Sequence, residues 1–297
     1  MSCRIRNFDK DIKIIKVSGN DAKVYLNNII TNNVEQINTK TSIYSCLLTP
    51  QGKFLADFFI TNFEDGYFLL VHSKFLEDLI KGLNFYKLRS KINIEDISHL
   101  YKYCFIPNPK IETIFETSIL NLGHTAISNS SYAFIDPRID SLGTHIVTSD
   151  NSIGQSELDL VEDDCLDHFL SHGLLSMYLI EDLTKFYPLE NNLHMLNAVD
   201  FKKGCYVGQE LTTRMKLRNK IPRTILPFIL DLKNDESHIK NEILENDTVV
   251  GEIIFQKNEY LFGHITFRKL SKDMSLDMQF NLKDQKLKIN QQDWLNF

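Results

Sequence analysis

The order of apolar patterns in the first hundred residues is the strongest constraint on the fold of this sequence. Residues 12–17 have the pattern of a strand, and a helix with one apolar face is expected over residues 22–30. Two strands around the turn at residues 50–53 come next, and residues 67–72 give a further strand. A second helix pattern starts after Ser73. Strand, helix, meander and helix in this order predict an α+β domain with an antiparallel sheet.

The strand patterns become short and closely spaced from Thr224 onward. Five strands are expected there, at residues 225–232, 248–255, 260–267, 278–282 and 287–289. Polar pairs such as Asn246-Asp247 and Lys283-Asp284 supply the turns between them. This pattern predicts a small β-barrel or sandwich. Ahead of it, shorter helices are expected at residues 164–175 and 189–199.

Composition places the chain among soluble globular proteins of two or three domains. It has 297 residues, of which 43% are hydrophobic and 24% are charged. A net charge of -6 excludes a general nucleic-acid coat, which would be strongly basic. Since the sequence shows neither a secretory signal nor an apolar run of transmembrane length, we expect a cytoplasmic protein that does not enter a membrane.

Cysteine usage indicates a reducing compartment. The cysteines are odd in number and widely spaced, and no CxxC pair occurs: Cys3, Cys46, Cys104, Cys165 and Cys205. Neither a disulfide framework nor a closed zinc site is expected from this spacing, and no metal ligand is assigned. Permanent ligation of a cluster by this chain alone is not expected either. We interpret the cysteines other than Cys205 as small buried hydrophobic residues.

One stretch, Lys203-Gly204-Cys205-Tyr206-Val207-Gly208-Gln209-Glu210, combines a thiol, two glycines, an amide and a carboxylate. Glycines permit turns that other residues resist and let a ligand approach the main chain. Lys202 and Lys203 shortly before Cys205 and a helix expected from Gln209 would both favour the thiolate. Cys205 is therefore a candidate nucleophile, cluster ligand or redox thiol, or alternatively a buried structural cysteine. A Cys–His hydrolase is weakly supported, because no histidine lies beside it.

The end of this stretch has the chemistry to bind a heterocycle. The carboxylate of Glu210 can accept two parallel hydrogen bonds, which suits a guanidine-like edge such as that of a pterin, and Gln209 can donate and accept beside it. The alternative is that Glu210 is a first-turn residue favoured by the helix dipole.

Seven basic residues lie between positions 202 and 223, against the single acid Glu210: Lys202, Lys203, Arg214, Lys216, Arg218, Lys220 and Arg223. In an acidic protein they predict a local positive patch for a phosphate backbone or a γ-glutamate tail. The alternative is a solvated charged face.

Taken together, these residues resemble the signature of a known family. The runs at 186–190 and 201–214 resemble the motif of the YgfZ family, in which the core K-G-C-Y-x-G-Q-E is followed four residues later by an arginine. The segments at 17–22, 48–53, 86–91 and 136–138 resemble further parts of that family. Members are folate-binding proteins of iron–sulfur cluster maturation or repair. They are related in fold to the glycine cleavage T-protein, an aminomethyltransferase.

The resemblance implies an α+β protein with a T-protein-like ring of three domains. Two would be ferredoxin-like α/β domains, one formed by residues 1–45 with 131–222 and the other by residues 46–130. Residues 223–297 would form a small C-terminal β-barrel. The resemblance also implies that a tetrahydrofolate binds in a central channel. Cys205 is then the reactive residue, and the folate-binding residues are Lys203, Gly204, Tyr206, Gly208, Gln209, Glu210 and Arg214.

In function, the resemblance implies an accessory protein for the assembly or repair of [4Fe–4S] enzymes, including tRNA-modifying ones. Its partners would be iron–sulfur client enzymes or cluster carrier proteins, and it would be a monomer. One alternative is a folate-dependent aminomethyl or one-carbon transferase, although residues 69–72 show no counterpart of the T-protein's catalytic aspartate segment. A second alternative is a tRNA-binding module over residues 202–223, although direct nucleic-acid binding is not expected at this net charge. A protein that is not an enzyme in the ordinary sense is the favoured interpretation.

Overall fold

The computed structural model describes residues 6–7, 11–107, 121–128, 131–149, 165–181, 183, 186–218, 221–230, 241–282 and 285–296. The chain divides into two compact units. Unit 1 comprises Met1–Cys165 and Leu196–Gln209, and unit 2 comprises Leu166–Met195 and Glu210–Phe297.

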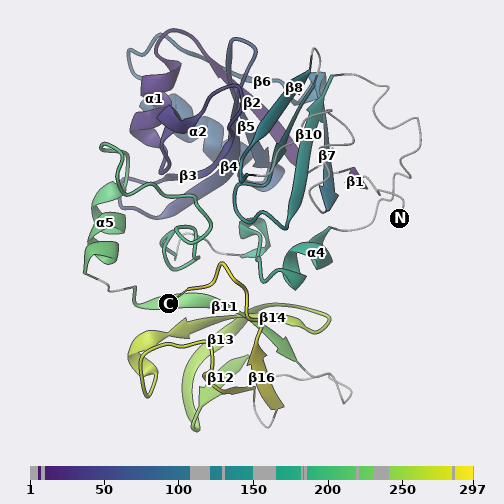
Figure 1. Ribbon diagram of the computed structural model, residues 1–297. Coiled ribbons are helices and arrows are strands. Elements are labelled where there is room, and N and C mark those ends of the chain that lie inside the picture. The colour runs from purple at the N-terminus through teal and green to yellow at the C-terminus, as the bar shows by residue number, and fades with distance from the viewer. Residues whose placement is uncertain are drawn as a thin grey trace. The chain divides into compact units, whose positions relative to one another are not determined.

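The first sheet of unit 1 is antiparallel and has the order β3-β4-β5-β2-β6. Its strands are β2 (Ile12–Ser18), β3 (Ile43–Leu48), β4 (Phe54–Phe63), β5 (Gly66–His72) and β6 (Asn93–Asp96). Helices α1 (Ala22–Ile29) and α2 (Leu76–Lys87) lie beside each other (Figure 1), and the hydroxyl of Tyr25 on α1 donates to the carbonyl of Leu83 on α2. The strand, helix, meander and helix predicted from periodicity are thus confirmed.

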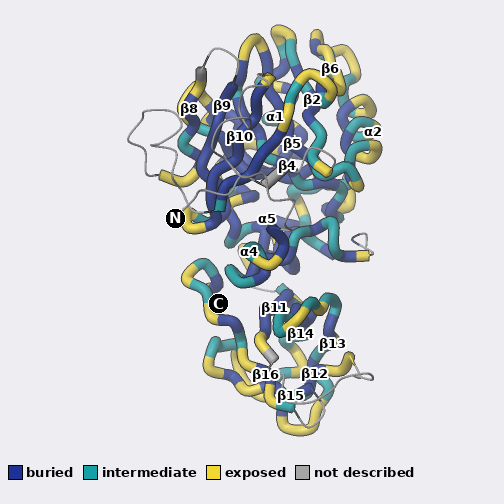
Figure 2. Tube along the Cα trace, turned by 90° about the vertical axis from the view of Figure 1, so that its right-hand side faces the viewer, coloured by how far each residue is buried: buried dark blue, intermediate teal, exposed yellow. Residues whose placement is uncertain are grey.

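A second antiparallel sheet of unit 1 has the order β1-β7-β10-β9-β8. Its strands are β1 (Arg6–Asn7), β7 (Lys102–Pro107), β8 (Thr125–Ser128), β9 (Ser131–Ile135) and β10 (Gly143–Thr148). Every residue of β9 and β10 is buried, as the continuous dark trace of these strands shows in Figure 2. Aromatic side chains join the two sheets, since the rings of Phe59 and the fully buried Phe134 lie 5.6 Å apart.

Unit 2 contains a closed barrel with the strand order β11-β14-β13-β12-β15-β16. Its strands are β11 (Arg223–Leu230), β12 (Glu242–Glu245), β13 (Thr248–Lys257), β14 (Tyr260–Thr266), β15 (Phe280–Leu282) and β16 (Gln285–Ile289). Fully buried Phe228, Phe280 and Leu261 are central to its core. The predicted small C-terminal β-barrel is confirmed.

The remaining helical elements among the described residues are short. They are α4 (Leu166–Ser171), α5 (Gln209–Leu217) and the 3₁₀ turns η1 (Val34–Gln36), η2 (Ser73–Phe75), η3 (Ser98–Leu100), η4 (Met177–Leu179) and η6 (Phe267–Lys269). None of the helices in the described ranges is both long and apolar enough to cross a membrane.

Three predicted features differ from the structure. The predicted domain boundary between residues 45 and 46 falls inside strand β3, because β2, β3 and β4 share one sheet. Residues 189–199 form turns rather than a helix, because Asn192 and Asn197 adopt positive φ values of 58° and 59°. The helix expected over 164–175 is shorter and ends before Gly173, whose φ is +66°.

Parts of the other predictions lie outside the described residues. These are the predicted domain boundary at residue 130, the turn Lys283-Asp284 and the basic residue Lys220.

Candidate functional site

The turn that carries Cys205 is anchored to unit 1 through Lys203. This lysine is buried, and its Nζ donates to the main-chain oxygens of Asn27 at 2.7 Å, Ile30 at 2.8 Å and Asn32 at 2.7 Å. Burial lowers the pKa of Lys203 to about 8, so the amine is still protonated at pH 7. Since the protein uses all three ammonium donors, we assign Lys203 to fixing the turn on the end of α1 rather than to direct contact with a ligand.

The other end of the turn is fixed by Val207 and Gly208. The amide of Val207 donates to the oxygen of Asn28 at 3.2 Å. Gly208 has a φ of +77°, and a Cβ built on it would lie 2.6 Å from the main-chain oxygen of Thr49. Only glycine fits this close approach to the turn between β3 and β4.

Between these anchors the chain is open to solvent. Gly204 and Cys205 are exposed, and a Cβ built on Gly204 would meet no atom within 4 Å. Tyr206 then returns to the interior, where its ring centroid lies 5.2 Å from the Nζ of Lys203. The first glycine of the motif therefore leaves space for an approaching molecule, while the second is required by packing.

Cys205 differs from the other cysteines of the described chain. Cys46, Cys104 and Cys165 are buried, whereas Cys205 is exposed. Burial raises the pKa of the Cys46 thiol to about 12, which leaves it inert at neutral pH. The interpretation of these three cysteines as small buried hydrophobic residues is confirmed, and the interpretation of Cys205 as a buried structural cysteine is wrong.

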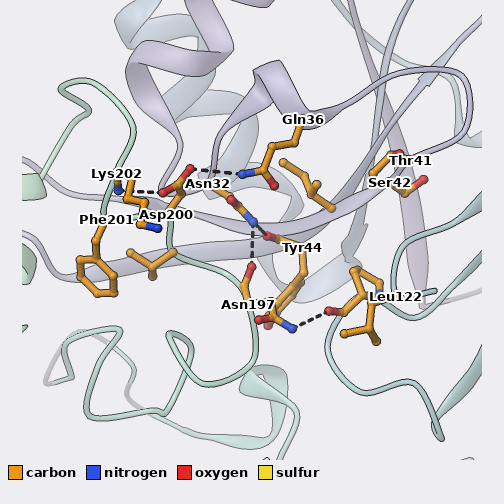
Figure 3. A pocket seen from close by; sticks show the side chains of 13 residues that line it. Asn32, Gln36, Thr41, Ser42, Tyr44, Leu122, Asn197, Asp200, Phe201 and Lys202 are labelled. Atoms are coloured by element: carbon orange, nitrogen blue, oxygen red, sulfur yellow. Dashed lines mark hydrogen bonds between the residues drawn. The ribbon is translucent and has the colours of Figure 1, made fainter.

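A cavity of about 490 Å³ lies in unit 1 beside the segment that leads into this turn (Figure 3). Its lining is Asn32, Gln36, Thr41, Ser42, Ile43, Tyr44, Leu122, Pro137, Asn197, Val199, Asp200, Phe201 and Lys202. Amide, hydroxyl and carboxylate groups alternate with apolar side chains, which is typical of sites that bind small organic molecules.

Hydrogen bonds from Thr31 and Asn32 hold one wall of the cavity in place. The hydroxyl of Thr31 donates to the oxygen of Ala198 at 2.6 Å. The side-chain amide of Asn32 donates to the main-chain oxygens of Tyr44 at 2.8 Å and Asn197 at 2.7 Å, as Figure 3 shows. Residues just after α1 therefore fix the segment that leads into the Cys205 turn.

The loop Asp136-Pro137-Arg138 supplies a second wall. The side-chain amide of Asn197 donates to the main-chain oxygen of Pro137 at 3.0 Å. Behind it, Asp136 is fully buried and pairs with Arg138 at 2.7 Å and with Nε2 of His145 at 2.9 Å. Burial opposes ionisation of the Asp136 carboxyl, but Arg138 and His145 hold its pKa well below its usual range.

Sequence reasoning missed Asp57, which is associated with this cavity. Asp57 on β4 accepts a hydrogen bond from the hydroxyl of Tyr44, a residue of the cavity wall. Burial raises the pKa of the Asp57 carboxyl, and Tyr44 and Arg138 oppose this effect. The guanidinium of Arg138 lies 5.3 Å from the ring centroid of Tyr44. A carboxylate within a strand of apolar residues was the available signal in the sequence.

The remaining predicted ligand residues begin helix α5. Gln209 is the last residue of unit 1, and its amide donates to the oxygen of Tyr206 at 3.2 Å. Glu210 and Arg214 are exposed residues of the part of α5 that belongs to unit 2. The helix predicted over residues 209–217 is confirmed.

The predicted seven-residue basic patch is not one surface. Lys203 is buried with its donors in use, as described above. Arg223 pairs with the buried carboxylate of Glu190 at 2.8 Å and stacks on Phe186 at 5.0 Å. Of the basic residues in the described ranges, Lys202, Arg214, Lys216 and Arg218 remain exposed. Structural use of the two most buried cations weakens the prediction of a polyanion site.

No group of three or more histidine, cysteine, aspartate or glutamate side chains is placed to hold a metal ion within the described part of the chain.

Comparisons with known proteins agree with this architecture. Residues 10–136 match the model of the GCVT N-terminal domain. A solved aminomethyltransferase T of the glycine cleavage system from Bartonella henselae is similar over 99% of this chain and 86% of its own, with a TM-score of 0.75. Sequence identity to it is 13%, so this likeness concerns the fold alone.

Several curated relatives are named iron-sulfur cluster assembly factor IBA57 or its homolog, mitochondrial. The protein from Dictyostelium discoideum is 28% identical over 77% of this chain and 63% of its own length. The protein from Neurospora crassa is 31% identical over 73% of this chain and 52% of its own length. The mouse protein is 26% identical over 73% of this chain and 64% of its own length. The chain thus spans between about half and just under two thirds of these relatives.

The matched segment and the shared architecture point to the same fold. Residues 10–136 are similar to the GCVT N-terminal domain, and the chain has the fold of the glycine cleavage aminomethyltransferase.

Proposed function

We propose that this protein is an accessory factor for the assembly or repair of iron–sulfur enzymes, of the YgfZ type. The observation that carries the proposal is the exposed Cys205 on a turn anchored by Lys203 and Gly208. Relatives named as iron-sulfur cluster assembly factors support it.

A single exposed thiol favours the transfer of an iron–sulfur cluster over its storage by this chain. A cysteine-bound [4Fe–4S] cluster takes four thiolates, whereas the described chain exposes one. A cluster held at Cys205 would therefore be shared with a carrier protein or a client enzyme, which would supply the other ligands. In this proposal the cluster is cargo, and the anchored turn presents the thiol with little loss of chain entropy on binding.

The second part of the proposal is that a tetrahydrofolate binds near this turn. The residues of the cavity fit such a ligand, because about 490 Å³ lies within the range of small-molecule sites and its lining combines polar side chains such as Gln36 and Thr41 with apolar ones. Independently of this cavity, the resemblance of residues 201–214 to the YgfZ motif supports Glu210 as the residue that would bind the amino-pyrimidinone edge of the pterin and Arg214 as the residue that would bind the glutamate tail. The folate would supply one-carbon or redox chemistry when bound.

Replacing Cys205 by alanine is expected to leave the fold intact and to abolish function. The side chain is exposed, so stability should change by less than about 0.5 kcal/mol. The measurement is the activity of a [4Fe–4S] enzyme in cells depleted of their own assembly factor, with the wild-type or variant chain expressed. The matched control is Cys104→Ala at a buried cysteine. Full rescue by Cys205→Ala would remove the thiol from the mechanism.

Replacing Glu210 by alanine is expected to weaken the binding of tetrahydrofolate by about tenfold to a hundredfold, since each charge-assisted hydrogen bond contributes about 1.5–3 kcal/mol. Titration calorimetry of both chains measures this difference. Glu181→Ala removes another exposed carboxylate of unit 2 and serves as the control. Equal affinity of wild type and Glu210→Ala would refute the pterin assignment and leave the role of Cys205 untouched.

A one-carbon transferase is the second candidate, and Asp57 is the observation that favours it. Burial raises the pKa of this carboxyl, which lies behind Tyr44 in the cavity wall. Release of ammonia from an aminomethylated carrier protein in the presence of tetrahydrofolate would establish turnover. Absence of turnover by the folded, folate-bound protein would leave the accessory role as the remaining candidate function.

The proposal includes a cytoplasmic, monomeric protein that acts on iron–sulfur client enzymes or cluster carriers, among them tRNA-modifying enzymes. Direct tRNA binding is not part of it, because Lys203 and Arg223 are committed to internal contacts.

A further inference from the structure

The turn that follows α2 holds a leucine in a backbone conformation that glycine prefers. Leu88 has φ 45° and ψ −115°, and the amide of Ser90 donates to the oxygen of Lys87 at 2.9 Å. These values define the first central position of a type II′ turn, where glycine avoids a steric penalty. Among the described non-glycine residues with positive φ, Leu88 is the one with an apolar side chain.

Packing of the Leu88 side chain does not offset this backbone strain. It is 87% exposed, and Phe85 in the last turn of α2 is 72% exposed. Helix α2 presents exposed and half-buried residues along its outer side (Figure 2). The amide of Lys91 donates to Asp21 at 2.6 Å, which brings this turn to the start of α1, where Val24 is 63% exposed.

A strained backbone that serves no packing purpose points to a role in binding. From these observations we infer that Phe85 and Leu88 form a docking surface for an acidic protein partner. The charges of the turn indicate the chemistry of this partner. Lys87 and Arg89 flank Leu88 in the sequence, Lys91 follows two residues later, and none of the three forms an ion pair within the described residues.

The chemistry of this surface favours a protein over other polyanions. Although the chain carries a net charge of -6, three cations on one turn without an ion pair to any described residue favour a complementary acidic surface. An apolar centre with a polar rim has the anatomy of a protein interface. Recruitment to an anionic membrane takes a larger cluster, of about 4–8 basic residues. The inference does not depend on the proposed function of Cys205.

Two substitutions at Leu88 separate binding from strain. Leu88→Ala removes the apolar contact and keeps the strained Cβ, so it should weaken binding about tenfold without raising Tm. Leu88→Gly should weaken binding equally and raise Tm by about 2–4 °C, because glycine adopts this conformation freely. Leu217→Ala, which removes another leucine that is 81% exposed, is the matched control for both measurements.

The probe is a fluorescent amphipathic helical peptide with leucines on one face and glutamates flanking them, titrated into the full chain and followed by anisotropy. Two control peptides replace the glutamates by lysine or the leucines by serine, and phosphatidylglycerol vesicles and a single-stranded RNA are titrated in parallel. The expected result is binding of the acidic leucine peptide alone, weakened by added salt and by both Leu88 variants but not by Leu217→Ala. Failure of this peptide to bind, equal binding by Leu88→Ala, or tighter binding of vesicles or RNA through Leu88 would overturn the inference.

Discussion

Replacing Asp136 by asparagine is expected to lower the free energy of unfolding by about 3–5 kcal/mol, because it breaks a buried ion pair from one side. The carboxylate is fully buried, and Oδ2 accepts from Arg138 Nη2 at 2.7 Å and from His145 Nε2 at 2.9 Å. Oδ1 also accepts from the main-chain amide of Arg138 at 2.8 Å. The asparagine would leave the guanidinium buried without its counter-charge, 4.9 Å from the ring centroid of Phe59.

The effect should extend from stability to the cavity. His145 is held between Asp136 and the hydroxyl of Tyr103, which lies 2.7 Å from Nδ1. Loss of the carboxylate is therefore expected to loosen Arg138, His145 and Tyr103, which lie behind the cavity wall that contains Pro137. Urea unfolding followed by far-ultraviolet circular dichroism measures the change. Glu77→Gln, which breaks an exposed ion pair with Lys81, is the control and should leave the midpoint unchanged.

The pH dependence of the free energy of unfolding provides a second test of this prediction. The folded-state pKa of Asp136 is depressed, so its contribution is complete above the unfolded value of about 3.9 and is lost as the pH falls toward the folded pKa. The stability of the wild type should fall more steeply below about pH 4 than that of Asp136→Asn. Equal stability of the two chains at pH 7 would contradict the role assigned to this ion pair.

Replacing Lys203 by methionine is expected to cost about 3 kcal/mol and to release the turn that carries Cys205. The ammonium satisfies the oxygens of Asn27, Ile30 and Asn32, and each buried carbonyl left without a donor costs about 1–3 kcal/mol. Relief of the desolvation that lowers the pKa of Lys203 to about 8 offsets part of this loss. Methionine is unbranched and only one atom shorter than lysine, so packing is changed little.

Hydrogen exchange measures the release directly. Amides of residues 203–208 should exchange faster in Lys203→Met, while those of the barrel strands β11 and β14 should not change. Lys202→Met alters the exposed neighbouring lysine and is the matched control. Unchanged exchange at residues 203–208 would show that Lys203 does not anchor the turn.

Periodicity and turn chemistry were sufficient to predict the first sheet of unit 1 with its helices and most strands of the barrel, but not the second sheet of unit 1. The helices α1, α2 and α5 and the meander of unit 1 follow from local patterns. Strand β12 was missed because Glu242 and Glu245 flank only two apolar residues. Glu245 is buried there because it accepts hydrogen bonds from the amide of Ser271 at 2.8 Å and from its hydroxyl at 2.6 Å. A tertiary contact therefore supports a strand that local propensity does not indicate.

The candidate site could be predicted only in part. The glycine-bracketed motif identified an exceptional turn, and Gly208 does adopt the positive φ that such turns require. The buried position of Lys203 could not be predicted, because lysines are rarely buried and its acceptors are main-chain oxygens, which leave no mark on the sequence. The cavity is formed by residues as distant in sequence as Asn32 and Asn197, which only the folded chain brings together.

In the proposed function, the anchored and exposed thiol of Cys205 serves the maturation of [4Fe–4S] enzymes. The most direct test measures the activities of a [4Fe–4S] enzyme and of a [2Fe–2S] enzyme together, in cells depleted of their own assembly factor, with and without the wild-type chain. We predict that the wild-type chain restores the [4Fe–4S] activity and that the Cys205→Ala chain, expressed to the same level, does not. Failure of the folded wild-type chain to restore that activity, or equal rescue by Cys205→Ala, would contradict the claim.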